Sequence, residues 1–411
     1  MDEVLTGGGR FRGTLEGGVK VFRGITFARC SRFGQAVLEP AAGQCIDAVS
    51  SGSITPQRSS RLSALFGDER KAPEIDEGRL CLSVYSPERA SNLPVMVWIH
   101  GGAFLTGGSE EPRYGCERLV RTADVVVVKI SYRLGAFGYL YLPDEGICNL
   151  GLEDQRTALQ WIHENIAEFG GNPDDVTLFG QSAGALSIAA LIATCEGKPL
   201  FHRAILQSAP LGIKMSGKEA SRISKAFLRH LGKDPREATL DEMLDAQQKV
   251  AGMKFGLTFM PVVPDFMAIP ESVKASGLSV IAGFTAEDAS PFMKFLGPIF
   301  DSTAGRALIH LGTKKTFISP TMEYIGRLRS CGLEASEYYI TWHPEGNPYG
   351  ACHCIELPFL LGDREDWLLA TMLQGMTDAE FESGSRELLA AWTSFATKGI
   401  FPYGKMLKRY N

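Results

Sequence analysis

The sequence of 411 residues lacks the long apolar runs that mark membrane-spanning segments. Its first ten residues have neither the basic start nor the apolar core of a signal peptide. It also lacks dense Lys/Arg clusters interleaved with aromatic residues, and its net charge is −5, which argues against a nucleic-acid-binding surface. These absences predict a soluble, cytoplasmic protein with no membrane span and no nucleic-acid partner.

Cysteine pairs of the Cys-X-X-Cys type are missing too, although the chain contains nine cysteines. An odd number without such pairs gives little support to a disulfide framework or a closed zinc site. The segment Cys352-His353-Cys354 is the one local exception. Adjacent side chains of an extended chain point to opposite sides, so this segment is poorly suited to a shared metal ion. We expect no metal and no cofactor.

The composition is that of an ordinary globular protein, with 45% hydrophobic and 22% charged residues. No internal repeat, low-complexity tract or Pro/Ser-rich linker divides the chain. Although 411 residues could form two or three domains, α/β folds often reach this length as one unit. We therefore expect a single domain over residues 1–411.

Short β-prone runs indicate an α/β fold with a mostly parallel central sheet. Residues 11–27 alternate apolar and polar side chains around Gly17-Gly18 and, with 80–85, predict antiparallel strands at the N-terminus. Later apolar runs alternate with helical periods, which is typical of parallel strands joined by right-handed crossovers. These runs are 95–99, 125–130, 176–179, 204–206, 280–282 and 338–342.

Helical periodicity predicts two long helices that pack on this sheet, at 152–167 and at 380–397, the second ending before Gly399. Between residues 216 and 250 lie two charged amphipathic segments, broken near Gly232 and Pro235, with no strand between them. We interpret these segments as a helical excursion over the sheet.

The most informative motif is Gly180-Gln181-Ser182-Ala183-Gly184, which follows a β-prone run and precedes an apolar helical stretch. A serine on a sharp strand-to-helix turn is held in a strained conformation that exposes its hydroxyl, and small neighbours are needed for the chain to pass. A chain with 45 glycines could contain this pentapeptide by chance in a solvent loop. Because strand, turn and helix are in register, we predict that Ser182 is a nucleophile.

A serine nucleophile needs a base, an acid that orients the base, and donors for the oxyanion. The backbone N–H of Ala183 is one expected donor, and Gly101, Gly102 and Ala103, which follow the 95–99 run, supply the others. His100 precedes these donors and is expected to brace the loop rather than transfer protons. The residues alone do not select the base, because His310, His343 and His353 all lie downstream of Ser182.

Five segments together resemble the type-B carboxylesterases, the α/β-hydrolase family that includes para-nitrobenzyl esterases and cholinesterases. They are residues 80–87, 98–104, 131–138, 149–156 and 169–184. The resemblance implies an α/β-hydrolase fold with antiparallel N-terminal strands, helices on both faces of the sheet and a helical cap. Asp154, Gln155 and Arg156 also match, and we interpret them as buried or semi-buried structural pairs and not as catalytic groups.

The resemblance also implies the base and the acid. The family's histidine lies in a Gly-Ala-X-His-X-X-Glu-Leu-Pro-Phe setting, which residues 350–359 match with His353 as the base. The family's carboxylate follows a glycine by five positions, which places Asp288 after Gly283, with Glu287 as the alternative acid. Two departures are Asp where the family most often has Glu, and Ala289 where it commonly has Gly.

The chain is shorter than most relatives, which implies a reduced cap formed by excursions around residues 211–277 and 289–335 and a more open pocket. Arg79 stands where many relatives have a disulfide cysteine. The expected function is hydrolysis of small-molecule carboxylic esters through an acyl-enzyme intermediate. The alternatives are a catalytically silent binding protein of the same fold, or an amidase or peptidase. Acyl and alcohol preference and oligomeric state are not predicted.

Overall fold

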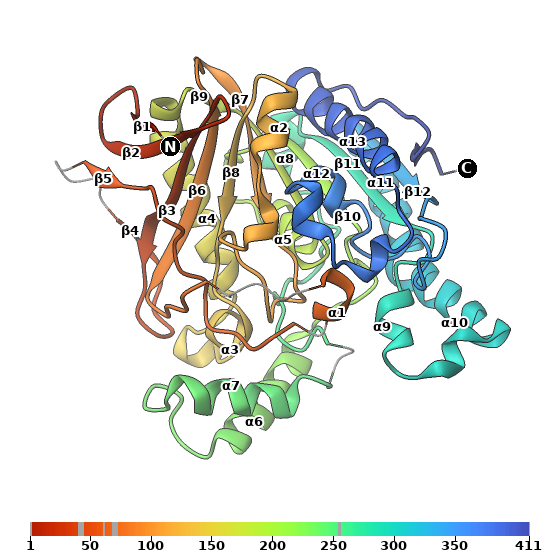
Figure 1. Cartoon of the computed structure of the whole chain (residues 1–411). Coiled ribbons are helices and arrows are strands. Elements are labelled where there is room, and N and C mark those ends of the chain that lie inside the picture. The colour runs from red at the N-terminus through yellow and green to blue at the C-terminus, as the bar shows by residue number, and fades with distance from the viewer. Residues whose placement is uncertain (1, 40–44, 61, 68–72, 254–255, 411) are drawn as a thin grey trace.

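The computed structural model describes residues 2–39, 45–60, 62–67, 73–253 and 256–410, and it is organised around one twisted central sheet (Figure 1). Along the sheet the order of strands is β1-β2-β3-β6-β8-β7-β9-β10-β11-β12-β13. The strands are β1 (Asp2–Leu5), β2 (Phe11–Glu16), β3 (Val19–Arg29), β4 (Val37–Leu38), β5 (Ile46–Asp47), β6 (Arg79–Pro87), β7 (Leu93–Ile99), β8 (Val126–Ile130), β9 (Gly171–Gln181), β10 (Arg203–Gln207), β11 (Ser279–Thr285), β12 (Ala335–Ile340) and β13 (Leu407–Lys408).

Strands β1, β2, β3, β6 and β8 pair antiparallel, whereas β8, β7, β9, β10, β11 and β12 pair parallel. The parallel part of the sheet is covered on both faces. Strand β8 shows this, because all five of its residues are buried. The predicted mostly parallel sheet with antiparallel N-terminal strands is confirmed. The last predicted strand is displaced, because β12 ends at Ile340 and not at residue 342. Its partner β11 also ends there, at Thr285, opposite Ile340.

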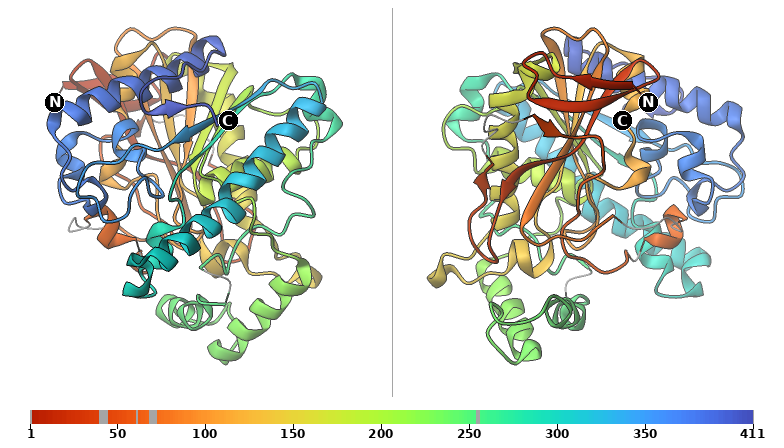
Figure 2. Two further views of the ribbon diagram at one scale, coloured as in Figure 1. Left: turned by 90° about the vertical axis from the view of Figure 1, so that its right-hand side faces the viewer. Right: turned by 60° about the vertical axis from the view of Figure 1, so that its left-hand side comes forward.

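Two layers of helices enclose the sheet (Figures 1 and 2). Helices α4, α5 and α11 pack on one face of the sheet and helices α2, α12 and α13 on the other. Each of the two layers buries one apolar cluster against the sheet. The helices are α1 (Ser63–Phe66), α2 (Glu117–Thr122), α3 (Gly135–Tyr139), α4 (Leu150–Asn165), α5 (Ala183–Ala193), α6 (Gly217–Leu231), α7 (Leu240–Val250), α8 (Glu271–Ser276), α9 (Ser290–Lys294), α10 (Thr303–Thr313), α11 (Ser319–Ser330), α12 (Leu357–Leu360) and α13 (Asp378–Lys398). The two long predicted helices correspond to α4 and α13.

Helices α6 and α7 form the first excursion and lie side by side below the sheet in Figure 1. Local signals define their ends. A capping box of Ser216 and Glu219 begins α6, Gly232 ends it in the left-handed region with φ of 75°, and a second capping box begins α7 at Thr239. Residues 254 and 255 of this excursion lie outside the described residues. The second excursion contains α9 and α10 and runs into α11 through a π-helical turn, Lys314–Ile318.

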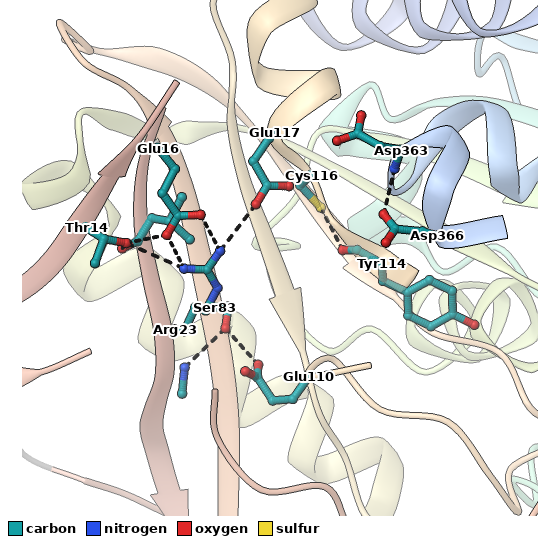
Figure 3. Close-up of polar contacts among 12 residues, drawn as sticks. Thr14, Glu16, Arg23, Ser83, Glu110, Tyr114, Cys116, Glu117, Asp363 and Asp366 are labelled. Atoms are coloured by element: carbon teal, nitrogen blue, oxygen red, sulfur yellow. Dashed lines mark hydrogen bonds and ion pairs between the residues drawn. The ribbon is translucent and has the colours of Figure 1, made fainter. Parts of the chain in front are cut away.

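Partly buried charges join the N-terminal strands and β6 to the segment between β7 and β8 (Figure 3). Arg23 of β3 pairs with Glu16 of β2 at 2.7 Å and with Glu117 of α2 at 3.4 Å. Nearby, the buried carboxylate of Glu110 accepts hydrogen bonds from the Ser83 hydroxyl at 2.7 Å and the Gly52 N–H at 3.0 Å. These contacts hold the antiparallel strands against the segment that follows β7, whose first residues belong to the candidate site.

Candidate active site

Ser182 lies at the sharp turn between β9, which ends at Gln181, and α5, which begins at Ala183 (Figure 1). Its φ and ψ of 57° and −119° are rare for a residue with a side chain. Two flanking glycines make the turn possible. A Cβ atom at Gly184 would lie 2.0 Å from the carbonyl oxygen of Ile99, and one at Gly180 would lie 2.8 Å from the same atom. The turn is therefore packed directly on the end of β7.

The loop that follows β7 lies against this turn. A Cβ atom at Gly101 would lie 3.3 Å from the Cβ atom of Ser182. The next residues, Gly102 and Ala103, have positive φ angles of 113° and 57°. Their N–H groups have no hydrogen-bond partner among the described residues, and the N–H of Ala183 belongs to the first turn of α5, where no intrahelical partner exists. The predicted oxyanion donors thus lie on two segments that meet at Ser182.

The imidazole of His353 is hydrogen-bonded to Asp288, with 2.7 Å between Nδ1 and Oδ1. Both side chains are almost fully buried. The other oxygen of Asp288, Oδ2, accepts the backbone N–H of Thr285 at 2.8 Å and the hydroxyl of Ser208 at 3.1 Å. These contacts fix the carboxylate and leave one oxygen for the imidazole.

The adjacent Glu287 turns away from this imidazole. Its carboxylate accepts the backbone N–H of Ala351 at 2.8 Å, and its own N–H donates to the carbonyl oxygen of the same residue at 2.9 Å. The other two histidines considered as bases, His310 and His343, are exposed. Of the candidates, the structure brings together Asp288 and His353.

The second nitrogen of His353, Nε2, lies 3.1 Å from the amide nitrogen of Gln181. An amide nitrogen only donates, so Nε2 accepts and the ring proton is on Nδ1, facing Asp288. No hydrogen bond between Ser182 and His353 is formed among the described residues. The side-chain amide of Gln181, the residue directly before Ser182, is therefore hydrogen-bonded to the nitrogen with which a general base would accept the serine proton. The sequence signal for this contact was the position of Gln181 inside the Gly-X-Ser-X-Gly motif, but the motif allows any residue there.

A second carboxyl group, Glu356, lies buried within electrostatic reach of Asp288 and His353 and was not predicted as a site residue. Burial raises its pKa to about 7, and the nearby Asp288 carboxylate adds to the rise. Its Oε1 accepts from the amide of Gln207 at 3.2 Å, while Oε2 has no partner in the described part of the chain. Its sequence signal was its place as the Glu of the Gly-Ala-X-His-X-X-Glu-Leu-Pro-Phe setting, three residues after His353. The aromatic rings of Phe292 and Phe317 cover His353, with centroids at 5.1 and 5.3 Å.

Asp154, Gln155 and Arg156 lie in the first half of α4 and pair with other segments, Arg156 donating to the carbonyl oxygen of Thr194 at 3.1 Å. Asp154 and Arg133 form a buried ion pair at 2.6 Å, and Gln155 donates to the hydroxyl of Ser187 at 3.1 Å. Within the described ranges, no group of three or more potential metal ligands occurs. In the same ranges, no helix is long and apolar enough to cross a membrane.

The model of the carboxylesterase family matches residues 2–304. The chain belongs to the carboxylesterase family. This carboxylesterase is 38% identical to a probable N-octanoylanthranilate hydrolase of Rhodococcus erythropolis, over 92% of this chain and 89% of the relative. It is 34% identical to the para-nitrobenzyl esterase of Bacillus subtilis, over 96% of this chain and 90% of the relative.

Solved structures agree with this assignment. The carboxylesterase superposes on a PNB esterase with a TM-score of 0.83 and 31% identity, covering 99% of this chain and 93% of the other. The predicted type-B carboxylesterase family and α/β-hydrolase fold are confirmed. The protein is a carboxylic ester hydrolase whose family acts on small-molecule esters.

Proposed function

We propose that this carboxylesterase hydrolyses esters through an acyl-enzyme intermediate on Ser182, with His353 as general base and Asp288 as the acid that orients it. The observation that carries the proposal is the 2.7 Å contact between Asp288 and Nδ1 of His353. It leaves Nε2 unprotonated and directed at the side chain of the residue next to Ser182. An imidazole held in this tautomer can accept a proton from a serine hydroxyl.

In the first step, the hydroxyl of Ser182 replaces the amide of Gln181 at Nε2 of His353 and loses its proton to that nitrogen as its oxygen attacks the ester carbonyl. The oxyanion is held by N–H groups from Gly101, Gly102, Ala103 and Ala183. The protonated imidazole then donates its proton to the leaving alcohol. In the second step, water attacks the acyl-enzyme through the same base, and Ser182 is restored.

Replacing Ser182 with Ala tests this proposal. Turnover of p-nitrophenyl acetate is expected to fall by about a million-fold, because the nucleophile is lost. A fluorophosphonate probe should label the wild-type protein and leave the variant unlabelled. More than a few per cent residual activity would reject Ser182 as the nucleophile, and a folded wild-type protein that resists the probe would favour a catalytically silent relative.

A second candidate activity is amide hydrolysis. It is favoured by the relative named as a hydrolase of N-octanoylanthranilate, since an N-acyl anthranilate is an amide. The same triad could cleave either bond, because the imidazolium can protonate an amine or an alcohol as it leaves. Turnover of octanoyl anilide compared with phenyl octanoate separates the two, since the acyl group is shared.

We also propose that residues 1–411 form one domain with the reduced cap described above, and that the protein acts in the cytoplasm. Its nine cysteines are all free, as is usual in a reducing compartment.

A further inference from the structure

Three consecutive residues of the loop after β7, Gly102, Ala103 and Phe104, have positive φ angles of 113°, 57° and 59°. Such backbone is strained for residues with side chains and persists only where the surroundings hold it. The loop is also the segment expected to hold the oxyanion, whose donors must keep their direction during the reaction. The groups that hold this backbone are therefore of functional interest.

Two buried side chains form hydrogen bonds with the carbonyl groups at the start of this loop. The hydroxyl of Tyr132 donates to the carbonyl oxygen of His100 at 2.8 Å. Nδ1 of His100 lies 2.8 Å from the carbonyl oxygen of Gly101. Both side chains have no exposed surface, and their rings stack with centroids 4.4 Å apart and planes 17° apart. The two residues form a stacked pair next to the first residues of the loop.

Each of these carbonyl groups belongs to the same peptide unit as an expected oxyanion donor. The peptide bond is planar, so a hydrogen bond that fixes the carbonyl of residue i also fixes the direction of the N–H of residue i+1. The carbonyl of His100 governs the N–H of Gly101, and the carbonyl of Gly101 governs the N–H of Gly102. A hydrogen bond at the carbonyl also polarises the peptide and strengthens its N–H as a donor.

The state of His100 fits this task and not proton transfer. A carbonyl oxygen only accepts, so Nδ1 carries the proton and Nε2 does not. Nε2 is buried without a hydrogen-bond partner among the described residues, and burial lowers the pKa of His100 to about 4. The ring is neutral at physiological pH. The loop closes tightly over it, since a Cβ atom at Gly107 would lie 2.5 Å from Nδ1.

We propose that His100 and Tyr132 are positioning residues of the oxyanion hole, which aim the N–H groups of Gly102 and Gly101 by holding the carbonyl oxygens of the same peptide units. This inference rests on the proposed function of Ser182. Neither side chain touches the substrate. Their effect is exerted in the transition state, where the oxyanion develops, and not on binding of the ester.

The matched pair His100→Leu and His100→Asn tests the proposal. Leu keeps the bulk of Asn and lacks a donor, whereas the amide nitrogen of Asn can replace Nδ1. Complete removal of one oxyanion donor lowers kcat by about 100- to 1,000-fold in other hydrolases. We therefore expect His100→Leu, which leaves the donor present but unaimed, to lower kcat for p-nitrophenyl acetate by roughly 10- to 100-fold with KM within about threefold. His100→Asn should recover most of the loss.

Comparing an ester with the matched thionoester, whose carbonyl oxygen is replaced by sulfur, separates a loss of oxyanion stabilisation from a general structural defect. A structural defect would lower kcat for both substrates alike. Sulfur accepts hydrogen bonds weakly, so hydrolysis of the matched thionoester depends less on the oxyanion donors. The ratio of ester to thionoester kcat should fall about tenfold in His100→Leu. It should fall less in Tyr132→Phe, which keeps the stacked ring and removes only the hydroxyl. Affinity for a trifluoromethyl ketone, whose adduct carries an oxyanion, should fall in parallel with kcat/KM.

Unchanged ester-to-thionoester ratios in folded His100→Leu and Tyr132→Phe would overturn the proposal, as would equal losses of kcat in His100→Leu and His100→Asn. If His100→Leu does not fold, Tyr132→Phe tests the same positioning role: its ratio should fall, while that of His100→Asn should stay near the wild-type value. The controls separate this inference from the proposed function. Activity that survives Ser182→Ala contradicts the nucleophile, whereas full loss in Ser182→Ala with unchanged ratios contradicts only the positioning residues.

Discussion

Replacing Glu356 with Gln is expected to stabilise the protein more at pH 8 than at pH 5. Glu356 is 1% exposed, and one of its oxygens has no hydrogen-bond partner in the described part of the chain. Burial, assisted by the negative charge of Asp288, raises its pKa from 4.5 to about 7, while His353 and the Gln207 hydrogen bond oppose the rise. The protein must therefore bury an unfavourable negative charge whenever this group ionises.

The direction of the pH effect follows from proton linkage. Between about pH 4.5 and 7 the folded protein binds the proton of Glu356 and the unfolded chain releases it, so stability contributed by this group is present at low pH and is lost as pH rises. The full difference corresponds to about 3 kcal/mol, at about 1.4 kcal/mol per pH unit. Most of this cost, about 2 to 3 kcal/mol, arises between pH 5 and pH 8.

Gln has the shape of Glu and no charge, so the variant avoids this cost. Urea unfolding of both proteins at pH 5 and pH 8, followed by tryptophan fluorescence, gives the two free energies of unfolding. The stabilisation by Glu356→Gln should be about 2 to 3 kcal/mol greater at pH 8 than at pH 5. The contribution of His100 to the pH dependence of stability has the opposite sign, because burial lowers its pKa to about 4. Its effect is shared by both proteins and cancels.

The matched control is Glu287→Gln, in the same part of the site. The carboxylate of Glu287 accepts a backbone N–H and is only partly buried, so its loss removes a charge-assisted hydrogen bond and should not stabilise the protein at pH 8. Equal stabilisation by Glu356→Gln at both pH values, or a greater effect at pH 5, would refute the burial argument.

Two further variants test the geometry of the site. Asp288→Asn should lower kcat by about 10,000-fold. The amide oxygen should accept the hydrogen bonds from Thr285 and Ser208 that Oδ2 accepts now, so the NH₂ group would face Nδ1 of His353 and select the wrong tautomer. A loss of less than tenfold in steady-state assays would contradict this orientation. Gly184→Ala should destabilise the protein by at least about 1 to 3 kcal/mol, since its Cβ atom would lie 2.0 Å from the carbonyl oxygen of Ile99. Gly326→Ala, in α11 with no atom near the added carbon, is its control and should be neutral or stabilising in thermal unfolding.

Local patterns were sufficient to predict the parts of the site that are continuous in sequence. The turn at Ser182 requires a strand, small neighbours and a helix within a few residues, and all of these are visible in residues 171–193. The glycine loop after β7 is predictable for the same reason. The capping boxes at Ser216 and Thr239 explain why the cap helices could be recognised as well.

The partners of Ser182 could not be selected in this way. Glu287 and Asp288 are adjacent, and chemical type alone does not distinguish them. Their directions follow from the packing of residues 351–353, since Glu287 pairs with the backbone of Ala351 while Asp288 faces the ring of His353. The resemblance to carboxylesterases favoured Asp288, whereas the physical cause lies in contacts between segments more than 60 residues apart.

Backbone preferences and apolar spacing within short stretches are enough to specify the layered α/β fold, the strained serine turn and the glycine loop. Three features of the site arise only on folding: Asp288 faces the imidazole of His353, the amide of Gln181 is hydrogen-bonded to its Nε2, and Glu356 is buried nearby. Those outcomes depend on burial and on hydrogen bonds between distant segments, and neither exists until the chain has folded.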